Sequence, residues 1–237
     1  MGRAGNYPGW YNRLNVCLLW SYWMLNLTAS MFISYLIVLL FAFPVHEFAH
    51  AWTANYFGDD TPRRSGRLTL NPLAHLDPIG SLLMLVAGFG WAKPVPVNPY
   101  ALEQRSPAAL MLVSLAGPLS NLLLAILASL PFRFGWVSVN QAYFDYSTST
   151  QHFLPTLPQV LLVFISVNLL LMLFNLIPLY PLDGEKIASY FFPPSWVRVL
   201  DAIRPIAPMI LLALVFVGGL SWIITPALNM LMRLLIG

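Results

Sequence analysis

The sequence predicts an all-α membrane protein that crosses the bilayer several times. Hydrophobic residues make up 58% of the 237-residue chain, charged residues make up only 9%, and the mean hydropathy is +0.70. Soluble domains usually carry about 25% charged residues. Four stretches contain no Asp, Glu, Lys or Arg: Leu14–Val45, Ser106–Phe132, Tyr146–Leu182 and Pro205–Met232. Each is longer than the ~20 residues that a helix needs to cross the hydrocarbon, so we expect a core of about four to six transmembrane helices.

The four apolar stretches place the elements of this core. We expect a helix over 30–56 that ends near Gly58, and two further helices over 107–131 and 158–177. A last hydrophobic region covers 205–232, where Gly218-Gly219 is a point of division. We read 1–237 as one integral-membrane domain made of a peripheral or extra N-terminal segment (1–29), a core (30–190) and a C-terminal transmembrane region (205–235).

The N-terminal segment superficially resembles a signal sequence. Arg3 and Arg13 precede the apolar run Leu14–Leu27. Because the apolar run continues through Val45, we expect an interfacial or short spanning element instead. The single cysteine, Cys17, excludes an intramolecular disulfide, and a net charge of +3 is too small to indicate a nucleic-acid partner.

One segment does not read as a normal span. Residues 66–100 contain an apolar part, 81–92, that is too short to cross the membrane comfortably, followed by Lys93-Pro-Val-Pro-Val-Asn-Pro99. We expect a re-entrant or β-hairpin structure here. Irregular backbone at membrane depth is tolerated only where it is buried in protein or lines a wet cavity.

Charge bias predicts the orientation. Cytoplasmic loops carry an excess of Lys and Arg. The connections 58–105 and 184–204 carry eight basic residues between them, whereas 132–156 carries only Arg133. We therefore expect both basic connections to be cytoplasmic.

The pattern His46-Glu47-Phe48-Ala49-His50 carries the first chemical signal. An H-E-x-x-H pattern on a helix is typical of zinc proteases, because histidines four apart share one face and can bind zinc while the glutamate acts as a base. Inside a bilayer, an ionisable residue is by default a functional-site hypothesis. The competing interpretation is a structural polar cluster.

A catalytic zinc usually has three protein ligands and an open water position, so a third ligand is needed. Asp183 is the best candidate, because it follows an uncharged run of 37 residues and an unpaired aspartate there would be costly. A structural helix cap is the alternative for Asp183. Of the other candidates, His75 and Asp77 belong to the loop and could form hydrogen bonds to the metal ligands, although a structural role is the favoured interpretation of His75. His152 falls in the expected outer connection, on the opposite side.

Four blocks of residues together resemble the site-2 protease family of intramembrane zinc metalloproteases. They are His46-Glu47-x-x-His50; Leu70-Asn-Pro-Leu-Ala-His-Leu-Asp-Pro-Ile-Gly80 with Trp91-Ala-Lys-Pro-Val-Pro-Val-Asn98; Ala116-Gly-Pro-Leu-Ser-Asn121; and Asn175-x-x-Pro178-x-x-Pro181-Leu-Asp183-Gly184. The chain is similar to the compact prokaryotic branch, which has no inserted PDZ domain or CBS pair. Two positions depart from the pattern: Tyr180 stands where the family often has proline, and Glu185 replaces the usual small residue after Asp-Gly.

The resemblance implies a function and a set of residues. It implies one zinc ion held by His46, His50 and Asp183, with Glu47 as catalytic base, in agreement with the reading from the residues. It also implies that Asn121 and Asn175 lie near the substrate or the developing oxyanion; the alternative is that they form hydrogen bonds between helices.

The expected activity is hydrolysis of peptide bonds within or near the transmembrane helices of membrane protein substrates, in regulated intramembrane proteolysis. The expected location is a prokaryotic inner membrane, with the active site nearer the cytoplasmic face. A zinc-binding transporter or sensor without hydrolytic activity is the main alternative, and a non-catalytic membrane scaffold is another. The sequence does not identify the physiological substrate, any need for prior cleavage or the oligomeric state.

Overall fold

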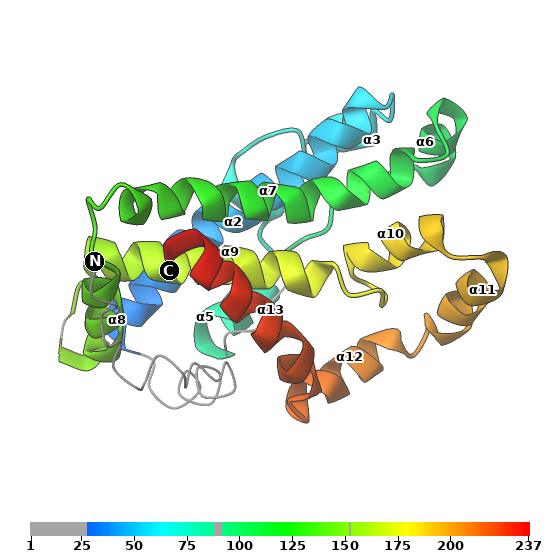
Figure 1. Cartoon of the computed structure of the whole chain (residues 1–237). Helices are drawn as coiled ribbons and strands as arrows, with labels where there is room; N and C mark the ends of the chain where they lie inside the picture. Colours follow the sequence, from blue (N-terminus) through cyan, green and yellow to red (C-terminus); the bar gives the residue numbers. More distant parts are fainter. Residues whose placement is uncertain (1–27, 88–91, 152) are drawn as a thin grey trace, which may run out of the picture.

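A computed structural model describes residues 28–87, 92–151 and 153–237. Over these residues the chain is built from helices, shown in Figure 1: α2 (Ala29–Tyr56), α3 (Thr61–Arg64), α4 (Pro72–His75), α5 (Pro78–Ala87), α6 (Pro99–Arg105), α7 (Ala109–Arg133), α8 (Val139–Ser147), η2 (Ser149–Gln151), α9 (Leu157–Asn175), α10 (Asp183–Phe191), α11 (Pro194–Ile203), α12 (Ala207–Phe216) and α13 (Gly219–Ile236). The expected all-α membrane architecture is confirmed. The N-terminal segment up to residue 27 lies outside the described residues, so its expected role stays a prediction.

Three long helices, α2, α7 and α9, pack against one another and form the centre of the molecule (Figure 1). The Thr28 side chain accepts a hydrogen bond from Met31 N and so begins α2, which continues through Pro44. Gly58 follows the end of α2 with a φ of +88°, a left-handed conformation that glycine adopts without strain. The bounds of all three helices agree with the expected ranges to within a few residues.

The part of the chain that the structure describes contains four helices that are long and apolar enough to cross a membrane: α2, α7, α9 and α13. The last hydrophobic region does divide at the glycine pair: Gly218, with a φ of +74°, separates α12 from α13. Of the two, only α13 is long enough to be a candidate span. Near its C-terminal end the Leu234 carbonyl accepts a hydrogen bond from Arg133, at the end of α7.

The segment 66–100 folds back on itself. The structure describes one antiparallel β-bridge here, between Leu76 and Ala92, and Lys93 N donates to His75 O at 2.8 Å. The guanidinium of the buried Arg67 donates to the carbonyls of Ala74 and Lys93 and so joins both arms of the fold. The expected loop 58–105 thus contains short helices around an irregular, folded-back centre.

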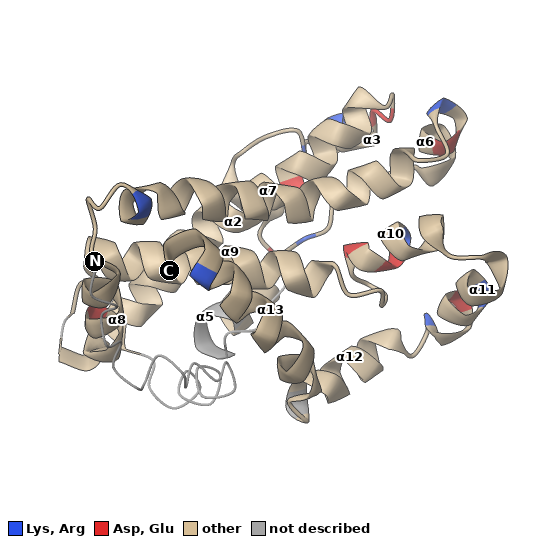
Figure 2. Ribbon diagram, in the orientation of Figure 1, with Lys and Arg blue, Asp and Glu red and all other residues tan. Residues whose placement is uncertain are grey.

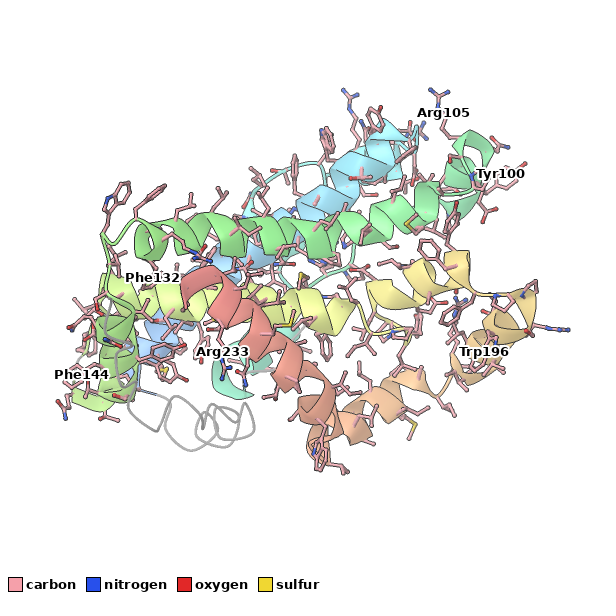
Figure 3. All side chains as sticks on the ribbon, viewed as in Figure 1. Tyr100, Arg105, Phe132, Phe144, Trp196 and Arg233 are labelled. Carbon is pink, nitrogen blue, oxygen red and sulfur yellow. The ribbon has the colours of Figure 1, made fainter. Side chains whose placement is uncertain are left out.

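The charged side chains are distributed unevenly along the molecule. Among the residues that the structure describes, most of the basic side chains gather at the end formed by α3, α6, α10 and α11, whereas those at the end of α7 and on α13 lie away from it (Figure 2). Tyr100, Arg105 and Trp196 mark the basic end in Figure 3, and Phe132 and Phe144 mark the opposite one. The distribution has the asymmetry that the positive-inside rule requires.

Candidate metal centre

His46 and His50 lie one turn apart on α2 and their imidazoles are buried. The two Nε2 atoms are 3.0 Å apart. The Asp183 carboxylate, at the start of α10, approaches both: its Oδ2 is 3.4 Å from His46 Nε2 and 3.2 Å from His50 Nε2. The folded chain therefore brings Asp183 to two histidines that precede it in the sequence by more than 130 residues, and the three form one group of ligand-type side chains.

A chain of hydrogen bonds fixes the orientation of His46. Its Nδ1 lies 2.5 Å from Asn121 Oδ1, Asn121 Nδ2 donates to Asn168 Oδ1 at 2.9 Å, and Asn168 Nδ2 donates to the Phe164 carbonyl. A backbone carbonyl can only accept, so it determines the direction of every bond in the chain. The proton of the neutral imidazole therefore sits on His46 Nδ1, and its Nε2 presents a lone pair.

A different partner orients His50. Its Nδ1 donates to the Val113 carbonyl at 2.7 Å, so its Nε2 also presents a lone pair. Val113, Gly117 and Asn121 are spaced by four residues and form one stripe of α7. A Cβ atom on Gly117 would lie 2.3 Å from His50 Nε2 and 2.6 Å from His46 Cε1, so only glycine lets α7 approach the imidazoles this closely.

A tight turn between α9 and α10 presents Asp183. We call residues 176–182 the ligand turn. A Cβ atom on Gly184 would lie 2.3 Å from the Ile177 carbonyl oxygen and 2.4 Å from that of Leu176, so the start of α10 packs directly against the backbone of this turn. Asp183 stands in the first turn of α10, where the helix dipole also favours a carboxylate.

The donor set fits a zinc ion. With both imidazoles neutral, their Nε2 lone pairs and a carboxylate oxygen converge on one point, an arrangement that a bound cation stabilises. Ligands bound at about 2.0–2.1 Å to a tetrahedral zinc lie about 3.3 Å from one another. The three separations of 3.0, 3.2 and 3.4 Å agree with this value. Metal-binding histidines usually donate their other ring N–H to an oxygen acceptor such as a backbone carbonyl, as His50 Nδ1 does to Val113. His46 Nδ1 donates to the amide oxygen of Asn121 in the same way.

Glu47 is buried beside the three ligand-type side chains but is not one of the residues that converge. Its Oε2 accepts a hydrogen bond of 3.2 Å from Val95 N, in the segment that follows the β-bridge. Glu47 and the three ligand-type residues all line a cavity of about 320 Å³. Other residues that line it come from α2, the 92–97 segment, α7, α9 and the ligand turn, among them Phe43, Val95, Val113, Phe174 and Pro181.

The two asparagines have different places. Asn175 lines the cavity, and its Nδ2 donates to the Leu171 carbonyl of its own helix. Asn121 is fully buried between His46 and Asn168 and does not line the cavity, so its contacts are those of a residue that orients a ligand. The sequence analysis assigned no role to Asn168 or to Gly117. Asn168 lies seven residues before Asn175, two turns away on the same face of α9, so its helical spacing from a candidate site residue could have indicated it.

The remaining candidates do not join the centre. His75 is buried, and its Nε2 donates to the Thr69 carbonyl at 2.7 Å, in agreement with a structural role. The Asp77 side chain accepts a hydrogen bond from Gly80 N at the start of α5. His152 lies outside the described residues.

Comparison with known proteins agrees with this geometry. The model of peptidase family M50 matches residues 34–217. The chain is 43% identical to "Putative zinc metalloprotease YwhC" of Bacillus subtilis over 81% of this chain and 84% of that protein. It is 31% identical to "Putative zinc metalloprotease Rip2" of Mycolicibacterium smegmatis over 78% of this chain and 64% of that protein, and 31% identical to Rip2 of Mycobacterium tuberculosis H37Rv over 78% and 68%. No solved structure matches the chain. The match over most of its length shows that this chain belongs to peptidase family M50, the site-2 protease family that its motifs resemble.

Proposed function

We propose that His46, His50 and Asp183 hold one catalytic zinc ion and that Glu47 is the general base for peptide-bond hydrolysis in the membrane. The chain is an intramembrane zinc metalloprotease by its family, and this membership favours proteolysis over metal transport or sensing. One observation carries the residue assignment: three lone-pair donors converge within a membrane-type helix bundle, and the carboxylate of Glu47 stands beside them without joining them.

The chemistry divides between the metal and this chain's own residues. When bound, zinc lowers the pKa of a water ligand to about 7 and polarises the substrate carbonyl. Glu47 takes the proton from the attacking water and delivers it to the leaving amine. The Val95 N–H holds Glu47 Oε2, so Oε1 is the oxygen that carries the proton. Asn121 and Val113 keep both imidazoles in the tautomer that binds metal.

The substrates of this family are membrane proteins, and we infer that an unwound stretch of a transmembrane helix enters the cavity. The 93–97 segment supports this inference. Lys93, Val95 and Asn98 each precede a proline, which restricts them to extended conformations. Pro94 and Pro96 have no amide hydrogen, so one edge of an extended 93–97 segment has no N–H donors. The other edge carries the N–H groups of Val95 and Val97, two residues that line the cavity. The Val95 N–H is bonded to Glu47, so the Val97 N–H is the donor on this edge that can pair with an extended peptide.

The position of the site along the bundle supports access from the cytoplasm. His46 precedes the C-terminal end of α2, Tyr56, by ten residues, which is about 15 Å of helix. That end is the basic end of the molecule (Figure 2). We therefore place the zinc within the membrane but nearer its cytoplasmic face, in the inner membrane of a prokaryotic cell.

Replacing Glu47 with Gln tests this assignment. The amide keeps the size of the side chain and cannot act as a base, so cleavage of a helical membrane substrate should fall to background while about one zinc per chain remains bound. The matched control is Glu103→Gln, an exposed glutamate on α6, which should cleave like the unmodified protein. Cleavage that survives in purified Glu47→Gln protein would overturn the role of Glu47.

A further inference from the structure

Glu185 is an unusual residue beside a metal ligand. It lies two residues after Asp183, its side chain is only 4% exposed, and it stands where the resembled family usually has a small residue. Burying a carboxylate is costly unless the charge is paired. A second acid this close to a zinc site would also repel Asp183 or compete with it for the metal.

One guanidinium pairs with Glu185. Arg204 Nη2 lies 2.5 Å from Glu185 Oε1. Arg204 follows α11 directly, so the contact joins α11 to the first turn of α10. The exposed Asp201 lies farther away, with Oδ1 at 3.7 Å from the same nitrogen, so Glu185 is the main partner. The hydrogen bond to Glu185 raises the pKa of Arg204 further above its usual value, and the arginine is charged at any physiological pH.

The same guanidinium contacts the other side of the metal ligand. Arg204 Cζ lies 5.6 Å from the centre of the Tyr180 ring, a cation–π distance. Tyr180 is three residues before Asp183, and Glu185 is two residues after it. Arg204 therefore contacts both positions at which this chain departs from the family pattern.

We propose that Arg204 is a positioning residue for the third zinc ligand: it holds Tyr180 and Glu185, and thereby fixes the Asp183 carboxylate toward His46 and His50. This inference rests on the proposed role of Asp183 as a ligand. Arg204 does not line the cavity that His46, His50 and Asp183 line. It joins the ligand turn to α11, a helix in which no residue is buried, and it neutralises the acid that would disturb Asp183.

The test measures zinc affinity by competition with a chelator in detergent-purified protein. Residues that orient a metal ligand typically contribute about 10- to 100-fold to affinity, so Arg204→Ala should lose zinc affinity by that factor. Arg198→Ala removes an exposed arginine from the same α11 and should bind zinc like the unmodified protein. Arg204→Lys, which keeps the charge without the planar group, should fall between them.

Two further measurements separate positioning from a general loss of structure. The helical content and thermal unfolding of the zinc-free Arg204→Ala protein should be close to those of the unmodified zinc-free protein. If helical content or thermal unfolding differs, a double variant that exchanges the two charged residues, Glu185→Arg with Arg204→Glu, decides. A zinc affinity higher than that of Arg204→Ala supports the proposal, and an affinity no higher than that of Arg204→Ala overturns it. Unchanged affinity in Arg204→Ala also overturns it. The proposed function fails separately, if the unmodified protein binds no zinc or if Asp183→Asn binds it equally well.

Discussion

The two sides of the metal centre are held in different ways. His46 and His50 sit inside α2, with their orienting partners on α7, and the three helices of the centre pack around them. Asp183 sits at the start of a nine-residue helix outside the candidate spans, and α11 beyond it buries no residue. We call these the scaffold side and the turn side. Two ligands therefore lie within a long helix of the bundle, whereas the third stands on a short helix that depends on the ligand turn and on the packing of α10 against α7.

The largest effect on the scaffold side should come from Gly117→Ala. The added Cβ would overlap both imidazoles, and α7 cannot retreat without losing its packing on α2. Zinc affinity should fall by more than about 100-fold, beyond what loss of one orienting hydrogen bond produces. Leu119→Ala, an exposed position two residues along α7, is the control. Zinc binding that survives in Gly117→Ala would show that the scaffold side is not rigid.

A smaller effect is expected for Asn121→Ala. It removes the acceptor that fixes the proton on His46 Nδ1, so zinc affinity should fall about 10- to 100-fold. Asn121→Asp keeps an acceptor oxygen and should recover most of the loss. Chelator competition measures both variants. Equal losses of zinc affinity in Asn121→Ala and Asn121→Asp would indicate that zinc affinity depends on the contact between Asn121 and Asn168, and not on the orientation of His46.

The smallest of the three effects should come from Asn168→Ala. It leaves the His46–Asn121 contact in place and removes the bond that holds Asn121, together with the bond that Asn168 donates to the Phe164 carbonyl of its own helix. A single hydrogen bond contributes about 0.5–1.5 kcal/mol, so the loss in zinc affinity should stay below about tenfold. A larger effect than that of Asn121→Ala would contradict the proposed order of the hydrogen-bond chain.

The contrast between the scaffold side and the turn side also explains which features could be predicted from the sequence. Uncharged runs gave α2, α7 and α9 to within a few residues, because hydrocarbon thickness dictates their length. The grouping of His46, His50 and Asp183 followed from the cost of leaving such side chains unpaired in lipid. The rotation of each helix about its own axis, by contrast, cannot be read from an uncharged run or from the cost of an unpaired side chain. Asn121 was expected either near the substrate or developing oxyanion or in a hydrogen bond between helices, and only the packed bundle shows that it faces His46. The Arg204 contact was also hidden, because it depends on how α11 returns to the ligand turn.

X-ray absorption at the zinc edge, in the unmodified protein and in Asp183→Asn, measures the proposed ligand set itself. For the unmodified protein we expect two imidazoles and low-atomic-number oxygen ligands at about 2.0–2.1 Å, with no sulfur at about 2.3 Å. Asp183→Asn should keep the two-imidazole signal and bind zinc more weakly, because only the turn side has been changed. A third imidazole, a sulfur ligand, or identical spectra and affinities in the two proteins would contradict the proposed ligand set.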